Sequence, residues 1–168
     1  MLRSIFFALS LFFLAACSGS FTHIPESDKI IDLTTALPGR SEKQIFEGAY
    51  QWMQENFTLP EEPISLVVPE EGSLIGHGRI PYPCSRLTCL TKGDWSVDFD
   101  MQVDAEPQGM LTTFRNIELT SPPSGQDPVN NGGMSSPVWS ERDMNAVRPL
   151  LIELNDELAA EIMQERRQ

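Results

Sequence analysis

The chain has 168 residues, of which 12 are basic and 24 are acidic, so its net charge is −12 at pH 7 with neutral histidines. Proteins that bind nucleic acid hold phosphates through clustered Lys and Arg, and this acidic composition does not fit that class. The length is enough for one domain with one hydrophobic core, and it is too short for two. We therefore expect a single acidic domain that does not bind nucleic acid.

Residues 1–16 have the features of a secretory signal peptide. Arg3 precedes an apolar run of about ten residues, which is too short to span a bilayer and ends at small residues. The sequence Leu14-Ala15-Ala16-Cys17 resembles the cleavage site of bacterial lipoproteins, in which the cysteine is lipidated and becomes the first residue. The resemblance implies a diacylglyceryl thioether on Cys17 and an amide-linked acyl chain such as palmitate. Two or more acyl chains predict stable attachment to a membrane, whereas one chain would hold the protein only weakly.

The residue after the proposed lipidated cysteine indicates which membrane holds the protein. Ser18 stands where lipoproteins of the enteric inner membrane commonly have aspartate, which favours the outer membrane. Removal of Arg3 with the signal leaves a net charge of −13, which keeps the domain away from anionic lipid. The alternative is an ordinary secreted protein that is cut at another site. Residues 17–27 lack periodicity and predict a lipidated tether, and we expect one domain over residues 28–168.

Cys84 and Cys89 remain as an even pair once Cys17 is lipidated. In the oxidising compartments outside the cytoplasm, their C-x4-C spacing is compatible with a disulfide that closes a small loop. A zinc site would need two further ligands, and the chain offers only His23 and His77. A redox-active pair is expected at C-x-x-C spacing next to the start of a helix. We therefore expect a structural disulfide, no metal site and no cofactor.

The first half of the domain is predicted to contain a strand and a helix. Lys29–Leu33 is expected to be the strand, and Pro38-Gly39 gives a turn signal after it. Ser41 and Gln44 have the spacing of a capping box, which predicts that a helix begins there. The apolar residues that follow recur at helical spacing and predict one buried face: Ile45, Ala49, Trp52, Met53 and Phe57.

Four extended segments follow the helix, at Ile64–Val68, Ser73–Ile80, Trp95–Asp104 and Met110–Leu119. The third segment alternates strictly between apolar and polar residues, so one of its faces should lie on the core and the other in water. Asp98, Asp100 and Asp104 share the outward face. Because a strand spaces these carboxylates too widely to wrap a cation, we expect a solvated acidic face and no metal site.

The last part of the chain is predicted to be a loop followed by a long helix. Residues 121–138 are rich in Pro, Ser, Gly and Asn, which predicts a flexible loop, with a binding loop as the alternative. Ser140 and Asp143 have cap spacing, and Pro149 should kink the helix or separate its first turn. An apolar stripe is expected to pack on the sheet: Met144, Val147, Leu151, Leu154, Leu158 and Ile162.

Several short motifs resemble a known bacterial family. They are Ile30-Ile31-Asp32-Leu33, Leu37-Pro38-Gly39, Ser41-Glu42-Lys43-Gln44-Ile45-Phe46, Ala49-Tyr50-Gln51-Trp52, Asn56-Phe57 and Gly76-His77-Gly78. They are similar to a domain of unknown function with a TATA-binding-protein-like fold that is found largely in envelope lipoproteins. The similarity covers residues 28–119, and the chain departs from it between Cys84 and Cys89 and in residues 121–138. The resemblance implies a fold and carries no established activity.

The predicted elements also define the fold class without the resemblance. Their order is β-α-β-β-β-β-α, which gives an α+β domain with two helices on one face of a curved antiparallel sheet. Fold does not determine function, so a nucleic-acid role is not implied by the similarity to the TATA-binding protein.

The sequence contains no catalytic motif, and we expect that the protein is not an enzyme and has no catalytic residues. It has no G-x-S-x-G, S-x-x-K or H-E-x-x-H motif and no phosphate-binding glycine loop. His77 between Gly76 and Gly78 could be a general base or a metal ligand, but no acidic partner stands at a recognisable spacing. The simpler interpretation is that the two glycines ease a bend or bulge in a strand beside a surface histidine.

Two functions remain open at this point. The first is a lipid-anchored envelope module that binds another envelope protein or stabilises an assembly through its sheet face or its terminal helix. The second is a small-ligand carrier or sensor with a pocket between the sheet and the helices, under residues 121–138. A pocket should leave polar residues on the inward face of the strands, and the inward residues from Trp95 to Val103 are all apolar. This pattern favours the interaction module.

Overall fold

The computed structural model describes residues 24–57, 63–85, 87–123 and 133–164. The predicted signal peptide and Cys17 lie outside these residues. The strands are β1 (Ile31–Ala36), β2 (Ile64–Val68), β3 (Ser73–Pro81), β4 (Ser96–Glu106), β5 (Gly109–Thr120) and β6 (Ser135–Pro137). The helices are α2 (Glu42–Asn56), α3 (Cys89–Lys92) and α4 (Glu141–Gln164), with short 3-10 helices η2 (Glu26–Lys29) and η3 (Pro69–Glu71).

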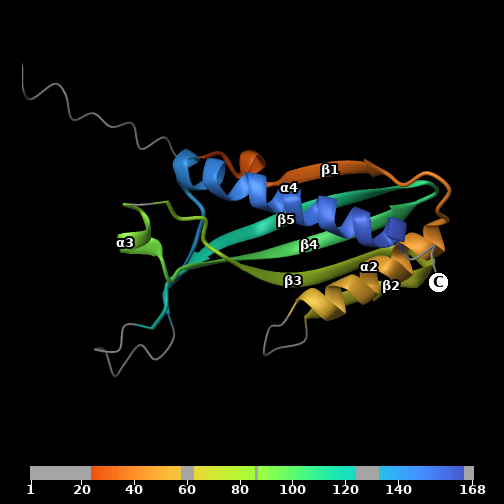
Figure 1. Cartoon of the computed structure of the whole chain (residues 1–168), viewed down its shortest axis with the longest axis horizontal. Helices are drawn as coiled ribbons and strands as arrows, with labels where there is room; N and C mark the ends of the chain where they lie inside the picture. Colours follow the sequence, from red (N-terminus) through yellow and green to blue (C-terminus); the bar gives the residue numbers. More distant parts are fainter. Residues whose placement is uncertain (1–23, 58–62, 86, 124–132, 165–168) are drawn as a thin grey trace, which may run out of the picture.

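The strands form one antiparallel sheet in the order β1-β5-β4-β3-β2, and β6 pairs with β5. Both long helices, α2 and α4, lie across the same face of this sheet (Figure 1). This arrangement confirms the predicted α+β fold with an antiparallel sheet and two helices on one face. Within the described part of the chain, none of the helices is long and apolar enough to cross a membrane.

The start of α2 confirms the predicted capping box. The backbone N–H of Gln44 donates to Ser41 Oγ at 3.3 Å, and the backbone N–H of Ser41 donates to Gln44 Oε1 at 3.0 Å. These two bonds satisfy donors that the first turn of a helix would otherwise leave unpaired. The helix then buries the predicted apolar face, and Ile45, Ala49 and Met53 are fully enclosed.

The glycine pair in β3 allows close packing of α2 on the sheet. A Cβ atom at Gly76 would lie 2.8 Å from the sulfur of Met53, and one at Gly78 would lie 2.4 Å from Cζ of Phe99. Both glycines therefore face the helices, and the aromatic rings of Phe57 and Phe99 fill the space that side chains would take. β3 pairs with β4 in unbroken register from Ser73 to Pro81, whereas its pairing with β2 shifts register between Ile64 and Leu66, opposite Gly76 and Ile75. An irregularity of the kind expected at the glycines is therefore present on one side of β3.

The terminal helix α4 is one continuous helix through Pro149, so the separation of its first turn that the proline suggested does not occur. Its predicted cap is present, since the backbone N–H of Asp143 donates to Ser140 Oγ at 3.1 Å. The buried stripe follows the expected spacing with two differences. Leu154 is only half-buried, and Asn155 is buried beside it and donates from Nδ2 to Thr35 Oγ1 at 3.0 Å.

Three predicted boundaries differ from the structure. Ile24, within the predicted tether, is buried and its backbone N–H donates to the Trp139 carbonyl, so the chain packs on the domain from Ile24. The predicted first strand begins at Ile31 because Glu26–Lys29 forms η2. The predicted loop 121–138 contains strand β6, which pairs with the end of β5. The flexibility expected for this loop falls largely on residues 124–132, which lie outside the described residues.

Candidate functional site

The candidate site is the face of the sheet opposite α2 and α4, which we call the open face. Residues that pair in register share a face, and the outward positions of β4 therefore identify their neighbours on β3, β5 and β1. The polar residues that these pairings place on the open face are Asp32, Thr34, Ser73, His77, Arg79, Ser96, Asp98, Asp100, Gln102, Asp104, Thr113, Arg115, Glu118 and Thr120.

His77 on the open face is held by a carboxylate from the neighbouring strand. It pairs in register with Asp100, and its Nδ1 contacts Asp100 Oδ1. The second oxygen of Asp100 accepts a hydrogen bond from Asn116 Nδ2 at 2.6 Å. Asn116 adopts a left-handed backbone (φ 51°) near an irregularity in the β4–β5 pairing. The acidic partner of His77 that the sequence did not reveal is therefore supplied by strand pairing, 23 residues along the chain.

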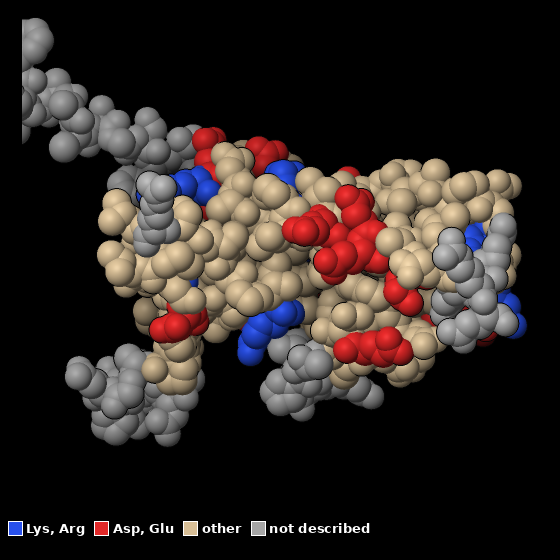
Figure 2. All heavy atoms as spheres, in the orientation of Figure 1, with Lys and Arg blue, Asp and Glu red and all other residues tan. Residues whose placement is uncertain are grey.

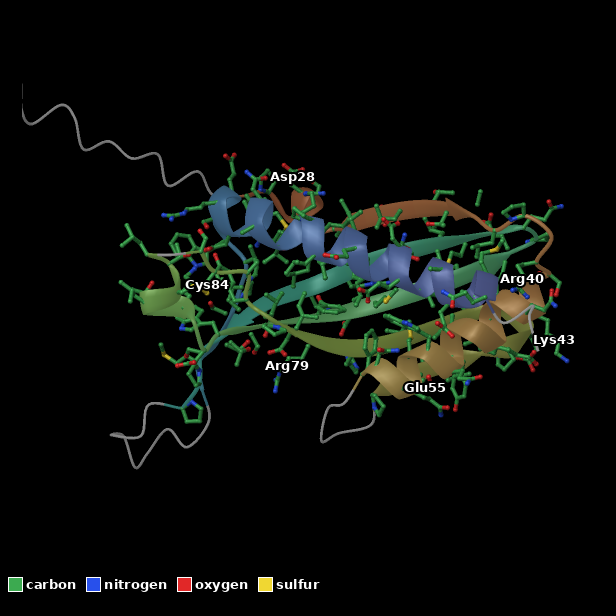
Figure 3. All side chains as sticks on the ribbon, viewed as in Figure 1. Asp28, Arg40, Lys43, Glu55, Arg79 and Cys84 are labelled. Atoms are coloured by element: carbon green, nitrogen blue, oxygen red, sulfur yellow. A yellow bond between two sulfur atoms is a disulfide. The ribbon has the colours of Figure 1, made fainter. Side chains whose placement is uncertain are left out.

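An ion pair between Arg79 and Asp98 lies beside the His77–Asp100 contact, on the same two strands (Figure 3). Arg79 contacts Asp98 through Nε, and Asp98 Oδ2 also accepts a hydrogen bond from Thr120 Oγ1. The hydrogen bond to Asp98 raises the pKa of Arg79, burial opposes this rise, and the charge of Asp98 adds to it. Arg79 thus stays charged, and both members of the pair are fixed in position.

The remaining outward carboxylates are also held by donors. Ser73 Oγ donates to Asp104 Oδ1 at 2.6 Å, and Gln102 Nε2 donates to the two oxygens of Asp104 at 3.0 and 2.8 Å. On the same face, towards the β1 edge of the sheet, Thr113 Oγ1 donates to Asp32 Oδ1 at 2.7 Å. The three aspartates of β4 share the outward face as predicted, but each is bound to neighbouring side chains and only half-exposed.

These contacts limit what the open face can do. Its carboxylates are Asp32, Asp98, Asp100, Asp104 and Glu118, and its basic groups are Arg79, Arg115 and His77. Phosphate recognition rests on an excess of basic groups, so the face is not suited to nucleic acid. Among the residues that the structure describes, no three His, Cys, Asp or Glu side chains come together in a way that could hold a metal ion.

A different polar cluster lies at one end of the molecule, where α3 meets α4. Asp143 accepts hydrogen bonds from Tyr82 Oη at 2.6 Å and from Lys92 Nζ at 2.7 Å. Lys92 also lies over the rings of Tyr82 and Trp95, 4.8 and 5.1 Å from their centroids. A disulfide joins Cys84 and Cys89 in the same loop, the two cysteines that the sequence pairs.

The environment of this cluster shifts two pKa values. Burial alone would raise the pKa of the Asp143 carboxyl, but hydrogen bonds from Lys92, Tyr82 and Ser140 and the charge of Lys92 lower it overall. Burial and the bond to Asp143 raise the pKa of Tyr82 to about 12. The stable state is therefore an ionised Asp143 with a neutral Tyr82, which anchors the disulfide loop to the first turn of α4.

The space between the sheet and the helices is filled by side chains. A series of edge-to-face aromatic contacts crosses it from Trp52 to Phe57, Phe99 and Phe114, with ring centroids 5.6, 6.0 and 5.6 Å apart. Two surface hollows lie elsewhere, one of about 440 Å³ at the start of α2 beside η3 and one of about 470 Å³ between η2 and the start of α4. Neither hollow is lined by a described residue of the segment 121–138, under which the ligand hypothesis expects a pocket.

The comparisons with known proteins agree with this architecture. A family model described as a domain of unknown function (DUF4468) with TBP-like fold matches residues 33–120. A crystal structure of a DUF4468 family protein from Bacteroides ovatus is similar with a TM-score of 0.54 and 16% identity, over 83% of this chain and 87% of that chain. A TBP-like protein from Parabacteroides distasonis is similar with a TM-score of 0.58 and 9% identity, over 84% and 97% of the two chains. No curated protein matches the sequence.

Proposed function

The chain belongs to the DUF4468 family of domains of unknown function with a TBP-like fold, and we propose that it is a lipid-anchored protein-interaction module of the bacterial envelope. Cys17 is its proposed lipid anchor, and the open face of its sheet is its proposed binding surface. The outer membrane is the proposed location, because Ser18 and not aspartate follows the cysteine.

The anchor is supported by the sequence at the start of the chain. A basic residue, a short apolar run and the Leu14-Ala15-Ala16-Cys17 site occur in the order that a lipoprotein signal requires. The described domain begins at Ile24, so six residues (18–23) separate it from the proposed anchor. Such a short connection would keep the domain close to the membrane.

The observation that carries the binding proposal is that the described helices cover only one face of the sheet. The opposite face presents polar groups that cross-strand contacts already fix, such as His77 with Asp100 and Arg79 with Asp98. Fixed side chains lose little conformational freedom when a partner binds, which lowers the cost of association. The excess of carboxylates on this face suits a partner with a basic surface, because charge complementarity steers encounter and selects partners.

The small-ligand alternative has less support. A carrier needs a hollow between the sheet and the helices, and the aromatic rings of Phe57, Phe99 and Phe114 occupy that space. The inward positions of β4 are Val97, Phe99, Met101, Val103 and Ala105, all of them buried and apolar.

Site-specific photocrosslinking in intact cells tests the binding surface. A photoreactive phenylalanine would replace Thr113, near the centre of the open face, and in a matched control it would replace Glu157, an exposed residue of α4. We expect a discrete crosslinked protein from position 113 that is absent from position 157. Adding Asp104→Lys should weaken that crosslink, because it replaces a carboxylate of the open face with a cation that a basic partner would repel. Identical patterns from both positions, or a discrete product from position 157 alone, would overturn the open face as the binding surface.

A further inference from the structure

One end of the molecule exposes large apolar side chains on a loop that is held in place. Leu87 and Leu90 are 79% and 81% exposed. Leu87 lies in the segment that the Cys84–Cys89 disulfide closes, and Leu90 follows that segment in α3. The bond between Lys92 and Asp143 fixes α3 to the first turn of α4. We call the surface formed by Leu87, Leu90 and Trp139, which precedes α4 and is 48% exposed, the apolar end.

The chain enters the domain at this same end. The backbone N–H of Ile24 donates to the carbonyl of Trp139 at 3.4 Å, and Ile24 is buried there. Figure 1 shows α3 and the start of α4 together at one extremity of the long axis, and the bond to Trp139 places Ile24, the first described residue, beside the start of α4. From Cys17 to Ile24 the fully extended chain spans at most about 25 Å, given 3.3–3.6 Å per residue. A lipid anchor at Cys17 would therefore hold this end next to the bilayer.

The distribution of charge favours the same orientation. Figure 2 shows the largest group of acidic side chains near the middle of the molecule, whereas the charged side chains near the end that carries α3 are fewer and of both signs. On α4 the exposed acids beyond Pro149 are Glu153, Asp156, Glu157 and Glu161. A chain with this negative charge gains no attraction from anionic lipid, so contact has to come from apolar side chains in the interfacial region. Exposed leucines on a fixed turn suit the interfacial region of a bilayer. Tryptophan suits it as well, because its ring is apolar and its N–H can bond to water.

We infer that the apolar end rests on the bilayer that holds the lipid anchor, with Leu87 and Leu90 inserted among the lipid headgroups and upper acyl chains and Trp139 beside them. This inference rests on the proposed anchor at Cys17. It assigns an orientation to the domain and a lipid-contacting role to the disulfide loop.

Quenching of tryptophan by brominated lipid tests the orientation. The mature lipoprotein would be reconstituted in phosphatidylcholine vesicles with brominated acyl chains, after Trp139→Phe removes the native indole of the apolar end. Leu90→Trp then reports on the apolar end, and Met163→Trp, in the last turn of α4, is the matched control. α3, which carries Leu90, is bonded to the first turn of α4, and Met163 lies in its last turn. The two ends of α4 lie about 36 Å apart, given 24 residues and a rise of 1.5 Å per residue. The Trp139→Phe protein gives the background of the other tryptophans.

We expect the Leu90→Trp protein to lose about half of its added emission, because interfacial insertion brings the indole near the bromines, and the Met163→Trp protein to lose almost none. Flotation of the vesicles in a density gradient first shows whether the protein is bound to them. If the vesicles float without the protein, the proposed lipid anchor at Cys17 is contradicted, and this inference is contradicted with it. If the protein floats and the two variants are quenched equally or not at all, the anchor stands and the inference is overturned. A third result would also overturn the inference. If the emission of the Leu90→Trp protein stays unquenched and shifts to the blue as more protein is bound per vesicle, the apolar end contacts a second copy of the chain.

Discussion

Tyr82, Lys92 and Asp143 show how a few polar residues, two of them buried, can hold a loop in place. Asp143 has three hydrogen-bond donors, from Tyr82, Lys92 and Ser140, and these offset the cost of burying its charge. Clusters of this kind also occur at catalytic sites, where residues with shifted pKa values are common. Here the three groups are directed at one another, and they join the disulfide loop to α4.

The raised pKa of Tyr82 predicts a loss of stability at alkaline pH. Because folding raises this pKa from 10.0 to about 12, the unfolded chain releases the proton first, and the stabilisation present below pH 10 is lost as pH rises towards 12. The lowered pKa of Asp143 acts in the opposite direction, so its contribution is lost as pH falls below the ordinary range of a carboxyl. Urea unfolding across this range should show both losses.

The variant Tyr82→Phe should remove the alkaline loss of stability, at a cost of about 1 kcal/mol at neutral pH for one lost hydrogen bond. Tyr50→Phe is the matched control, because Tyr50 lies on the half-exposed surface of α2 and should leave the alkaline loss in place. An unchanged alkaline profile in Tyr82→Phe would contradict the role given to the cluster.

The close packing of Phe99 on Gly78 leads to a second prediction about a single residue. A Cβ at this position would lie 2.4 Å from Phe99 Cζ, so Gly78→Ala should destabilise the domain by about 1–3 kcal/mol through overpacking. Phe99→Leu in the same chain should recover part of that loss by making room. Thermal unfolding of the single and double variants measures the coupling. Additive losses would show that the glycine is not required for the close packing of Phe99.

Among the elements, α4 provides the most direct test of packing. Leu158 is fully buried against the core, so Leu158→Ala should reduce the free energy of unfolding by about 2–5 kcal/mol. Leu154 is half-buried and should cost less, and Ile152, which is exposed on the same helix, should change stability by no more than about 0.5 kcal/mol. Equal midpoints for Leu158→Ala and Ile152→Ala would show that the helix does not pack as described.

The elements also show how far the sequence predicts the structure. The alternation in β4, the capping box of α2 and the stripe of α4 are local patterns, and each predicted the correct element. The short strand β6 was missed because Ser-Ser-Pro has no period and forms only by pairing with β5. The contact of His77 with Asp100 was missed for a related reason. It depends on the register of β3 and β4, whose connection of 14 residues, 82–95, gives no turn signal that fixes register.

At the scale of the whole molecule, the proposed anchor, the apolar end and the open face fit one orientation. With the apolar end on the bilayer, α4 would extend away from it over about 36 Å, given 24 residues and 1.5 Å per residue. The open face would then stand at the side of the molecule, accessible to another envelope protein. The acidic helices would lie away from the lipid surface, as the charge of the chain requires.

The central claim is that Cys17 carries the lipid that places this domain at a membrane, and metabolic labelling with an alkyne fatty acid measures it most directly. We predict that the wild-type chain takes up the label and sediments with membranes, whereas Cys17→Ala is unlabelled and shifts out of the membrane fraction. Cys84→Ala with Cys89→Ala is the control, because these cysteines form the disulfide and their loss should leave labelling unchanged. Equal labelling of the wild type and Cys17→Ala would contradict the claim.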